Sequence, residues 1–191
     1  PSTGNYQLED NENYLSFVNG FYDYTLFVGI QVINTTARET PADLLDVPFD
    51  DPRMIAAFKA LFDALRPSLT ENIRYFSIGN EVDVYLNAHP DEWATYKTFF
   101  DAAAQYVRQS APWLQVGVTV TYGSAQIDAE KVEHLTENAD IVILTYYPFL
   151  EALMVDDPAA PLADFPRMLE LGGGRPVILQ EVGYPSAEML G

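Results

Sequence analysis

Two glutamates, each at the end of a short apolar run, are the residues of this chain best placed to do chemistry. The run 73–80 (IRYFSIGN) leads directly into Glu81, and the run 176–180 (PVILQ) leads into Glu181. Both runs are typical of buried parallel strands, so each acid is expected at the C-terminal end of its strand. A (β/α) barrel builds its active site at that end. Two carboxylates that converge there can hydrolyse a glycosidic bond.

In the hydrolysis of a glycosidic bond the two carboxyl groups have different roles. One must protonate the leaving oxygen, and the other must attack the sugar carbon or activate water; for direct attack the groups lie about 5 to 5.5 Å apart. The acid must hold its proton near neutral pH, which burial or the charge of its partner favours. The nucleophile must stay ionised and therefore needs hydrogen-bond donors. Opposite walls of a barrel mouth can bring Glu81 and Glu181 together although they are 100 positions apart in the sequence.

The rest of the chain consists of alternating helices and strands that would position the two acids. Apolar residues that recur every three or four positions predict helices, and runs of β-branched and aromatic residues predict strands. Asp51 and Pro52 provide an N-cap and a first-turn proline, and the cluster 172–174 (GGG) is typical of a helix C-cap and turn. Helices are expected at 9–21, 51–65, 90–107, 128–136 and 162–171, and strands at 24–33, 73–80, 114–122, 140–147 and 177–181.

This alternation predicts an α/β fold with a parallel sheet covered on both faces. A doubly wound sheet would usually show a glycine-rich turn after a strand, but the only glycine cluster, 172–174, precedes one. Polar and aromatic residues at several strand ends favour a TIM (β/α)8-type barrel instead. Only five strands are found, whereas a closed barrel needs eight strands and about 250 residues. We therefore expect residues 1–191 to form a single, incomplete barrel domain.

The composition narrows the range of partners. There are 28 acidic and 10 basic residues, a net charge of −18; this charge repels phosphate and argues against nucleic acid, whereas a neutral glycan is compatible with it. The sequence has no cysteine, and its two histidines, His89 and His134, are far apart, so no metal or other cofactor is expected. No run approaches the roughly 20 apolar residues of a membrane span, and no leader segment is visible in a chain that starts at Pro1.

Three motifs, in order, resemble a clan of retaining glycoside hydrolases built on (β/α)8 barrels. In that clan an asparagine and the acid/base end the fourth strand, and the nucleophile ends the seventh; residues 79–82 (GNEV) and 181–186 (EVGYPS) resemble these segments. The most similar families are the endo-β-1,3-glucanase-like enzymes, with a Glu-x-Gly-Trp-Pro-Ser segment, and the endo-β-1,4-galactanases, whose Ser-Tyr-Tyr-Pro-Phe segment is similar to residues 145–149 (TYYPF). Residues 1–6 (PSTGNY) resemble the stretch after the second strand. The resemblance therefore covers the whole chain and implies the third to seventh strands.

The resemblance implies a role for each motif residue. Glu81 would be the general acid/base, Glu181 the nucleophile, and Asn80 a hydrogen-bond partner of the sugar 2-hydroxyl. One of Tyr146 and Tyr147 would donate a hydrogen bond to the nucleophile. Neighbouring strand residues point to opposite faces, so only one of them can do this, and the apolar run favours neither.

A retaining glycoside hydrolase that cleaves β-linked poly- or oligosaccharide is the expected function. The alternative is a non-catalytic carbohydrate-binding or scaffold fragment, because the first two strands and the eighth have no counterpart here. Another metal-free barrel enzyme with two carboxylates explains Asn80 beside Glu81 less well. Tyr184, in place of the more usual tryptophan, would be a sugar-stacking platform or a loop aromatic. Open strand edges predict self-association, and polysaccharide-degrading enzymes usually act outside the cytoplasm, which favours a secreted or periplasmic location.

Overall fold

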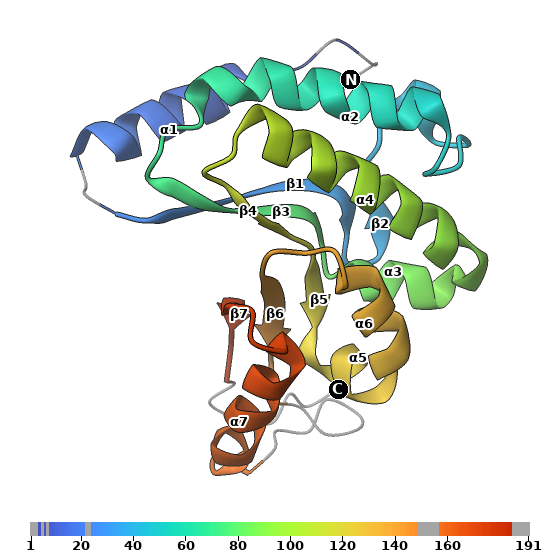
Figure 1. The fold of residues 1–191 in the computed structure, drawn as a ribbon, viewed down its shortest axis with the longest axis vertical. Coiled ribbons are helices and arrows are strands. Elements are labelled where there is room, and N and C mark those ends of the chain that lie inside the picture. Colours follow the sequence, from blue (N-terminus) through green and yellow to red (C-terminus); the bar gives the residue numbers. More distant parts are fainter. Residues whose placement is uncertain (1–3, 5, 7, 22–23, 149–156, 185–191) are drawn as a thin grey trace, which may run out of the picture.

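The chain folds into two small sheets joined where one strand leads into the next (Figure 1). The structure is a computed structural model that describes residues 4, 6, 8–21, 24–148 and 157–184. One sheet has the order β2-β1-β3-β4 and the other β5-β6-β7. All pairings are parallel except that between β1 and β2. The strands are β1 (Leu26–Asn34), β2 (Ala37–Arg38), β3 (Ile73–Asn80), β4 (Gln115–Gly117), β5 (Thr119–Thr121), β6 (Val142–Tyr146) and β7 (Val177–Val182).

Val118 alone separates β4 from β5, so the two sheets form one series of parallel strands. This series is β1, β3, the pair β4 and β5, β6, and β7. It matches the five strands expected from the sequence and is a partial TIM-type barrel, as predicted. Within the described residues, β7 has no partner on its outer edge, and β1 pairs there only with β2, at Ile33 and Asn34.

The strand register places the site residues next to one another. Asn34 of β1 pairs with Asn80 of β3. Between β6 and β7, Leu144 pairs with Leu179 but the next residue, Thr145, pairs with Glu181. Gln180 is therefore an extra residue, a β-bulge of the kind common at barrel rims, where it re-aims side chains.

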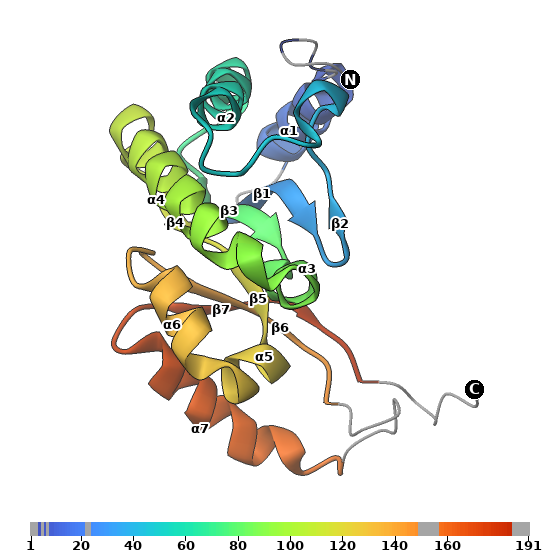
Figure 2. The same ribbon diagram turned by 90° about the vertical axis from the view of Figure 1, so that its right-hand side faces the viewer.

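Helices connect the strands and cover the sheets. In Figures 1 and 2, α2 and α4 lie over the β1–β3–β4 sheet, and α5, α6 and α7 lie beside the β5–β6–β7 sheet. None of the helices in the described part of the chain is long and apolar enough to cross a membrane. The helices are α1 (Glu9–Phe21), α2 (Pro52–Leu65), α3 (Val82–Ala88), α4 (Trp93–Ser110), α5 (Tyr122–Ile127), α6 (Ala129–Thr136) and α7 (Ala160–Gly172), with short 3-10 turns at Ala42–Leu44, Arg66–Ser68 and Pro90–Glu92.

The longer helices form where the sequence pattern places them because each has one apolar face. The side chain of Asp51 caps α2 by accepting a hydrogen bond from the backbone N–H of Arg53, and Gly173 ends α7 in the left-handed conformation, as the sequence predicted. One continuous hydrophobic cluster runs from α1 to α7. Its largest fully buried aromatic side chains are Phe49, Phe62, Phe76, Tyr96, Phe99 and Phe100.

Two short helices and one strand break differ from the sequence prediction. Helices α3 and α5 are only seven and six residues long, and neither was expected. The strand expected at 114–122 is divided at Val118, and its last residue, Tyr122, begins α5. A Cβ atom on Gly117 would lie 2.8 Å from the carbonyl oxygen of Ile141, so glycine allows a close approach of two backbones just before the break.

Candidate active site

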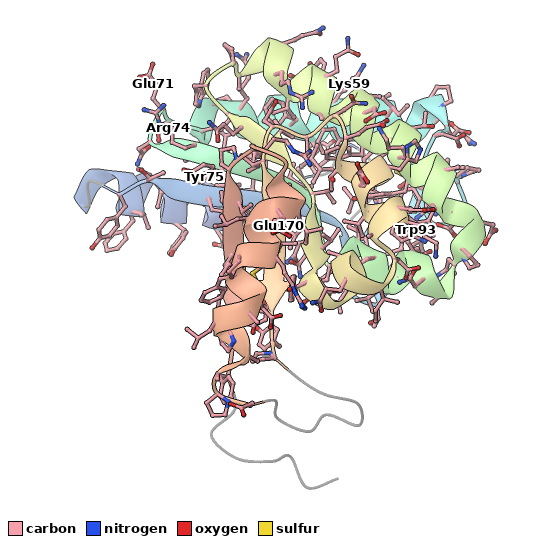
Figure 3. All side chains as sticks on the ribbon, turned by 60° about the horizontal axis from the view of Figure 1, so that its bottom comes forward. Lys59, Glu71, Arg74, Tyr75, Trp93 and Glu170 are labelled. Carbon is pink, nitrogen blue, oxygen red and sulfur yellow. The ribbon has the colours of Figure 1, made fainter. Side chains whose placement is uncertain are left out.

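The C-terminal ends of the parallel strands meet on one side of the molecule. Figure 2 shows the β1–β2 turn, α3 and the ends of β6 and β7 on that side. The starts of the strands lie at the opposite end, where Arg74 and Tyr75 lie near the start of β3 (Figure 3). Asn80, Glu81, Thr145 and Glu181 all lie at the C-terminal end, as expected for the active side of a barrel.

Glu81 directly follows β3 in an unusual backbone conformation. Its φ is +45°, and Gly79, two residues earlier, has φ +95°. A Cβ atom on Gly79 would overlap the Tyr96 hydroxyl and the Val82 side chain. That hydroxyl donates a hydrogen bond to the carbonyl of Ile78 at 2.9 Å, which holds α4 against the end of β3. The glycine before Asn80-Glu81 is therefore required by both conformation and packing.

Two threonine hydroxyls hold the Glu81 carboxylate. Thr35, just after β1, donates to Oε2 at 2.8 Å, and Thr145 of β6 donates to Oε1 at 2.7 Å. Each of the two carboxylate oxygens thus accepts one bond, from strands on opposite sides of β3. The side chain is held between the two sheets.

Asn80 lies in a buried chain of polar side chains. It is 6% exposed, its Nδ2 donates to Asn34 Oδ1 at 3.2 Å, and its Oδ1 accepts from Gln180 Nε2 at 3.1 Å. Gln180 Oε1 in turn accepts a hydrogen bond from the Thr119 hydroxyl, which also contacts that of Ser77. The bulge at Gln180 lets this side chain reach Asn80 while the next residue remains at the site.

Glu181 is held by Tyr147. The Tyr147 hydroxyl donates to Oε2 at 2.9 Å, and Gln180 Nε2 lies 3.4 Å from Oε1. This bond to the carboxylate, with partial burial and the charges of Glu181 and then Glu81, raises the pKa of Tyr147. A Cβ atom on Gly183 would overlap the Tyr147 ring, so glycine at this position lets the ring lie over the end of β7.

The neighbouring tyrosine, Tyr146, donates its hydroxyl to a different acid. Its partner is Asp164 Oδ2 of α7, at 2.7 Å, and Tyr122 donates to Oδ1 of the same carboxylate at 3.1 Å. Burial, followed by Asp164, raises the pKa of Tyr122 to about 12. Thr145 and Tyr147 are two residues apart and share one face of β6, whereas Tyr146 points to the other. Of the two candidates, Tyr147 is the one placed on Glu181.

A cavity of about 440 Å³ adjoins Glu81 and is lined in part by Thr145, Tyr146 and Tyr147. Tyr184 lies just past β7 and is 43% exposed. Phe149, Pro185 and Ser186, which belong to the motifs identified in the sequence, lie outside the described residues.

The described residues contain no group of three or more acidic, histidine or cysteine side chains that could hold a metal ion.

Several residues that hold the candidate site together do not stand out in the sequence. Thr35, Thr145 and Gln180 contact the predicted residues directly. Asp83 is fully buried and accepts bonds from the backbone and hydroxyl of Thr121, at 2.9 and 2.6 Å, and its burial raises its pKa. The position of Thr35 beside the expected strand end at Asn34 was the one signal that could have found it.

No protein-family model and no curated protein sequence matches the chain. Solved structures do match its fold. The GH53 catalytic domain of Ignisphaera aggregans is 12% identical with a TM-score of 0.69, and the match covers 97% of this chain and 53% of that one. The β-glycosidase BGL167 is 17% identical with a TM-score of 0.68, over 98% and 61% of the two chains. An exo-β-1,4-mannosidase from Opitutaceae bacterium strain TAV5 is 18% identical with a TM-score of 0.69, over 96% and 37%.

The chain spans about half the length of these structures, from 37% to 61%. At such low identity the likeness concerns the fold alone. Together with the five parallel strands, it shows that this chain is a partial (β/α) barrel with the fold of glycoside hydrolase catalytic domains.

Proposed function

We propose that the chain is a single partial barrel domain of a retaining glycoside hydrolase that cleaves β-glycosidic bonds. The observation that supports this most is that β6 contacts both glutamates from one face. Thr145 donates to Glu81, and Tyr147, two residues further on, donates to Glu181. The two carboxylates therefore lie around the same strand end, as a reaction with two carboxylates requires.

In the proposed reaction Glu181 attacks the anomeric carbon while Glu81 gives its proton to the leaving oxygen. The bond to the leaving oxygen breaks, and a sugar ester of Glu181 forms. Glu81, now ionised, takes a proton from water, whose oxygen bonds to the anomeric carbon as the ester bond breaks and Glu181 is released. The proton that Glu81 gives in the first step is thus restored in the second.

The other predicted residues have supporting places in this scheme. Asn80 Nδ2 carries two hydrogens, of which one is donated to Asn34, so the second can donate to a sugar hydroxyl. Tyr147 donates a hydrogen bond to Glu181 and so orients its carboxylate. Tyr146 lines the cavity beside Glu81, and we assign it to sugar binding on that ground. Tyr184, three residues after Glu181 in the sequence, is exposed and would provide a stacking surface.

Hydrolysis of a panel of aryl β-glycosides and of β-glucan and β-galactan oligomers tests this function. Wild type is expected to hydrolyse at least one member, and Glu181→Gln to lose at least about 10³-fold in kcat/KM, because the nucleophile is removed. The first product seen by NMR should have the β configuration. Glu130→Gln, at an exposed position of α6, is the matched control and should retain activity.

A non-catalytic carbohydrate-binding role is the second candidate. It is favoured by the outer edges of the strand series in the described part of the chain, where β7 has no partner strand and β1 pairs only with the two-residue strand β2. Calorimetric titration of the same oligomers distinguishes the two. Binding without turnover would support this role, and turnover that Glu181→Gln abolishes would exclude it.

A further inference from the structure

Two pairs of residues at the ends of β1 and β3 are coupled side by side. The first pair is Asn34 and Thr35, and the second is Asn80 and Glu81. Asn34 accepts a hydrogen bond from Asn80, and Thr35 donates one to Glu81. The backbone N–H of Thr35 also donates to the carbonyl of Asn80 at 2.9 Å. Thr35 thus holds the peptide that precedes Glu81 and the Glu81 carboxylate at the same time.

Thr35 and Glu81 are also the two described residues other than glycine that have positive φ, at +53° and +45°. For a β-branched residue such as threonine this conformation is a genuine outlier. Such residues cost about 1 to 3 kcal/mol each and persist where their surroundings over-determine them, most often at functional sites. Here the two strained residues contact each other through the hydrogen bond from Thr35 to Glu81. Both strained positions therefore lie at the carboxylate of Glu81.

The chemistry of the partners differs between the two glutamates. Both contacts to Glu81 come from hydroxyl groups, which donate to a carboxylate and can turn to accept from a carboxylic acid. Glu181 has one hydroxyl partner and one amide N–H, and the amide N–H can only donate. A group that loses and regains a proton in every cycle needs partners that serve both of its forms.

We propose that Thr35 is a positioning residue for Glu81, holding its carboxyl group toward the leaving oxygen in both protonation states, with Thr145 as the second support. This inference rests on the function proposed above. Thr35 does not touch the substrate in this scheme; it acts through Glu81.

The test compares leaving groups. Dinitrophenyl β-glycosides leave without protonation, whereas a sugar or alkyl leaving group needs the acid. We expect Thr35→Val, which keeps the β-branched shape, to lower kcat/KM about 10- to 100-fold for the poor leaving group and by less than about 3-fold for dinitrophenyl, since one hydrogen bond to a charged group is lost. Thr35→Ser, which keeps the hydroxyl, should stay close to wild type on both substrates. Thr98→Val removes an exposed hydroxyl on α4 and is the control.

Thermal unfolding of every variant accompanies the kinetics. Equal losses on both substrates with a lowered Tm would show a merely structural role and overturn the inference, as would an unchanged kcat/KM on the poor leaving group. If wild type hydrolyses neither substrate, the proposed function fails and the inference fails with it. If wild type is active and Glu181→Gln is not, a failure of the Thr35 pattern concerns Thr35 alone.

Discussion

Two adjacent tyrosines at the end of β6 donate their hydroxyls to acids on opposite faces of the sheet. Tyr147 binds Glu181 at the strand ends, and Tyr146 binds Asp164 of α7 on the helix side. The same side chain at two neighbouring positions therefore contacts the proposed nucleophile in one case and an acid of α7, beside the cavity, in the other. This division follows from strand alternation alone.

Replacing Tyr146 and Tyr147 separately by phenylalanine compares the roles of the two hydroxyl groups. Tyr147→Phe removes the hydroxyl donor of the proposed nucleophile and should lower kcat/KM about 10- to 100-fold with little change in Tm. Tyr146→Phe leaves Asp164 with Tyr122 as its remaining tyrosine donor and should lower the free energy of unfolding by about 1 to 3 kcal/mol. Urea denaturation and steady-state kinetics measure both effects. A larger activity loss in Tyr146→Phe than in Tyr147→Phe would contradict the assignment.

Some residues of the candidate site stand out in the sequence and others do not, for physical reasons. Glu81, Asn80 and Glu181 stand out because polar residues interrupt apolar runs at strand ends. Thr35 and Thr145 do not, because threonine is common in strands and turns and their role depends on contacts across 46 and 64 positions. No sequence period could choose between the two tyrosines, since both faces of β6 are buried.

At the scale of the elements, the turn from β3 into α3 depends on one glycine. Gly79 has a φ that side-chain-bearing residues rarely adopt, and the space where its side chain would be is occupied by Tyr96 of α4. The helix that packs against β3 therefore also fixes the path of the backbone into Asn80 and Glu81.

Gly79→Ala should lower the free energy of unfolding by about 3 kcal/mol or more, through overpacking and backbone strain together. Gly123→Ala is the control, because a Cβ atom there meets nothing and the residue lies inside helix α5. We expect the control to be neutral or stabilising by up to about 1 kcal/mol. Urea denaturation of both variants measures the difference, and equal stabilities would show that Tyr96 and Val82 can move away.

The alternation of elements could be read from the sequence because each long helix and strand carries its own apolar period. Helices α3 and α5 could not be predicted from the sequence, because a helix of one or two turns is too short to show an apolar period. The bulge at Gln180 was invisible for a different reason: the run 176–180 reads as a continuous apolar strand, and the bulge exists only relative to β6.

At the scale of the whole molecule, the end of the strand series leaves apolar surface uncovered. Leu162, Phe165 and Leu169 are spaced three and four residues apart along α7, and are between 44% and 80% exposed. The outer edge of β7, the strand that follows α7, has no partner strand in the described part of the chain. Exposed apolar residues on a helix and an open strand edge each favour association.

We expect the chain to self-associate as its concentration rises, most clearly in about 0.5 M salt, where the repulsion from its net charge of −18 is screened. The double variant Leu162→Gln with Leu169→Gln should shift light-scattering masses toward the monomer without changing the net charge. Ile127→Gln, at an 85% exposed position on α5, is the control and should associate like wild type. A monomeric wild type across the concentration range would refute this prediction.

The arrangement of Glu81 and Glu181 on two different sheets has a consequence for the order of folding. Helix α2, β3, α4 and β4 are close in sequence and can form contacts early, because short loops cost little entropy to close. The bonds that join the sheets at the site span 64 positions from Glu81 to Thr145 and 100 positions from Asn80 to Gln180. The candidate site is thus completed only when the C-terminal strands dock, and a refolding chain would regain most of its helical signal before its two glutamates are brought together.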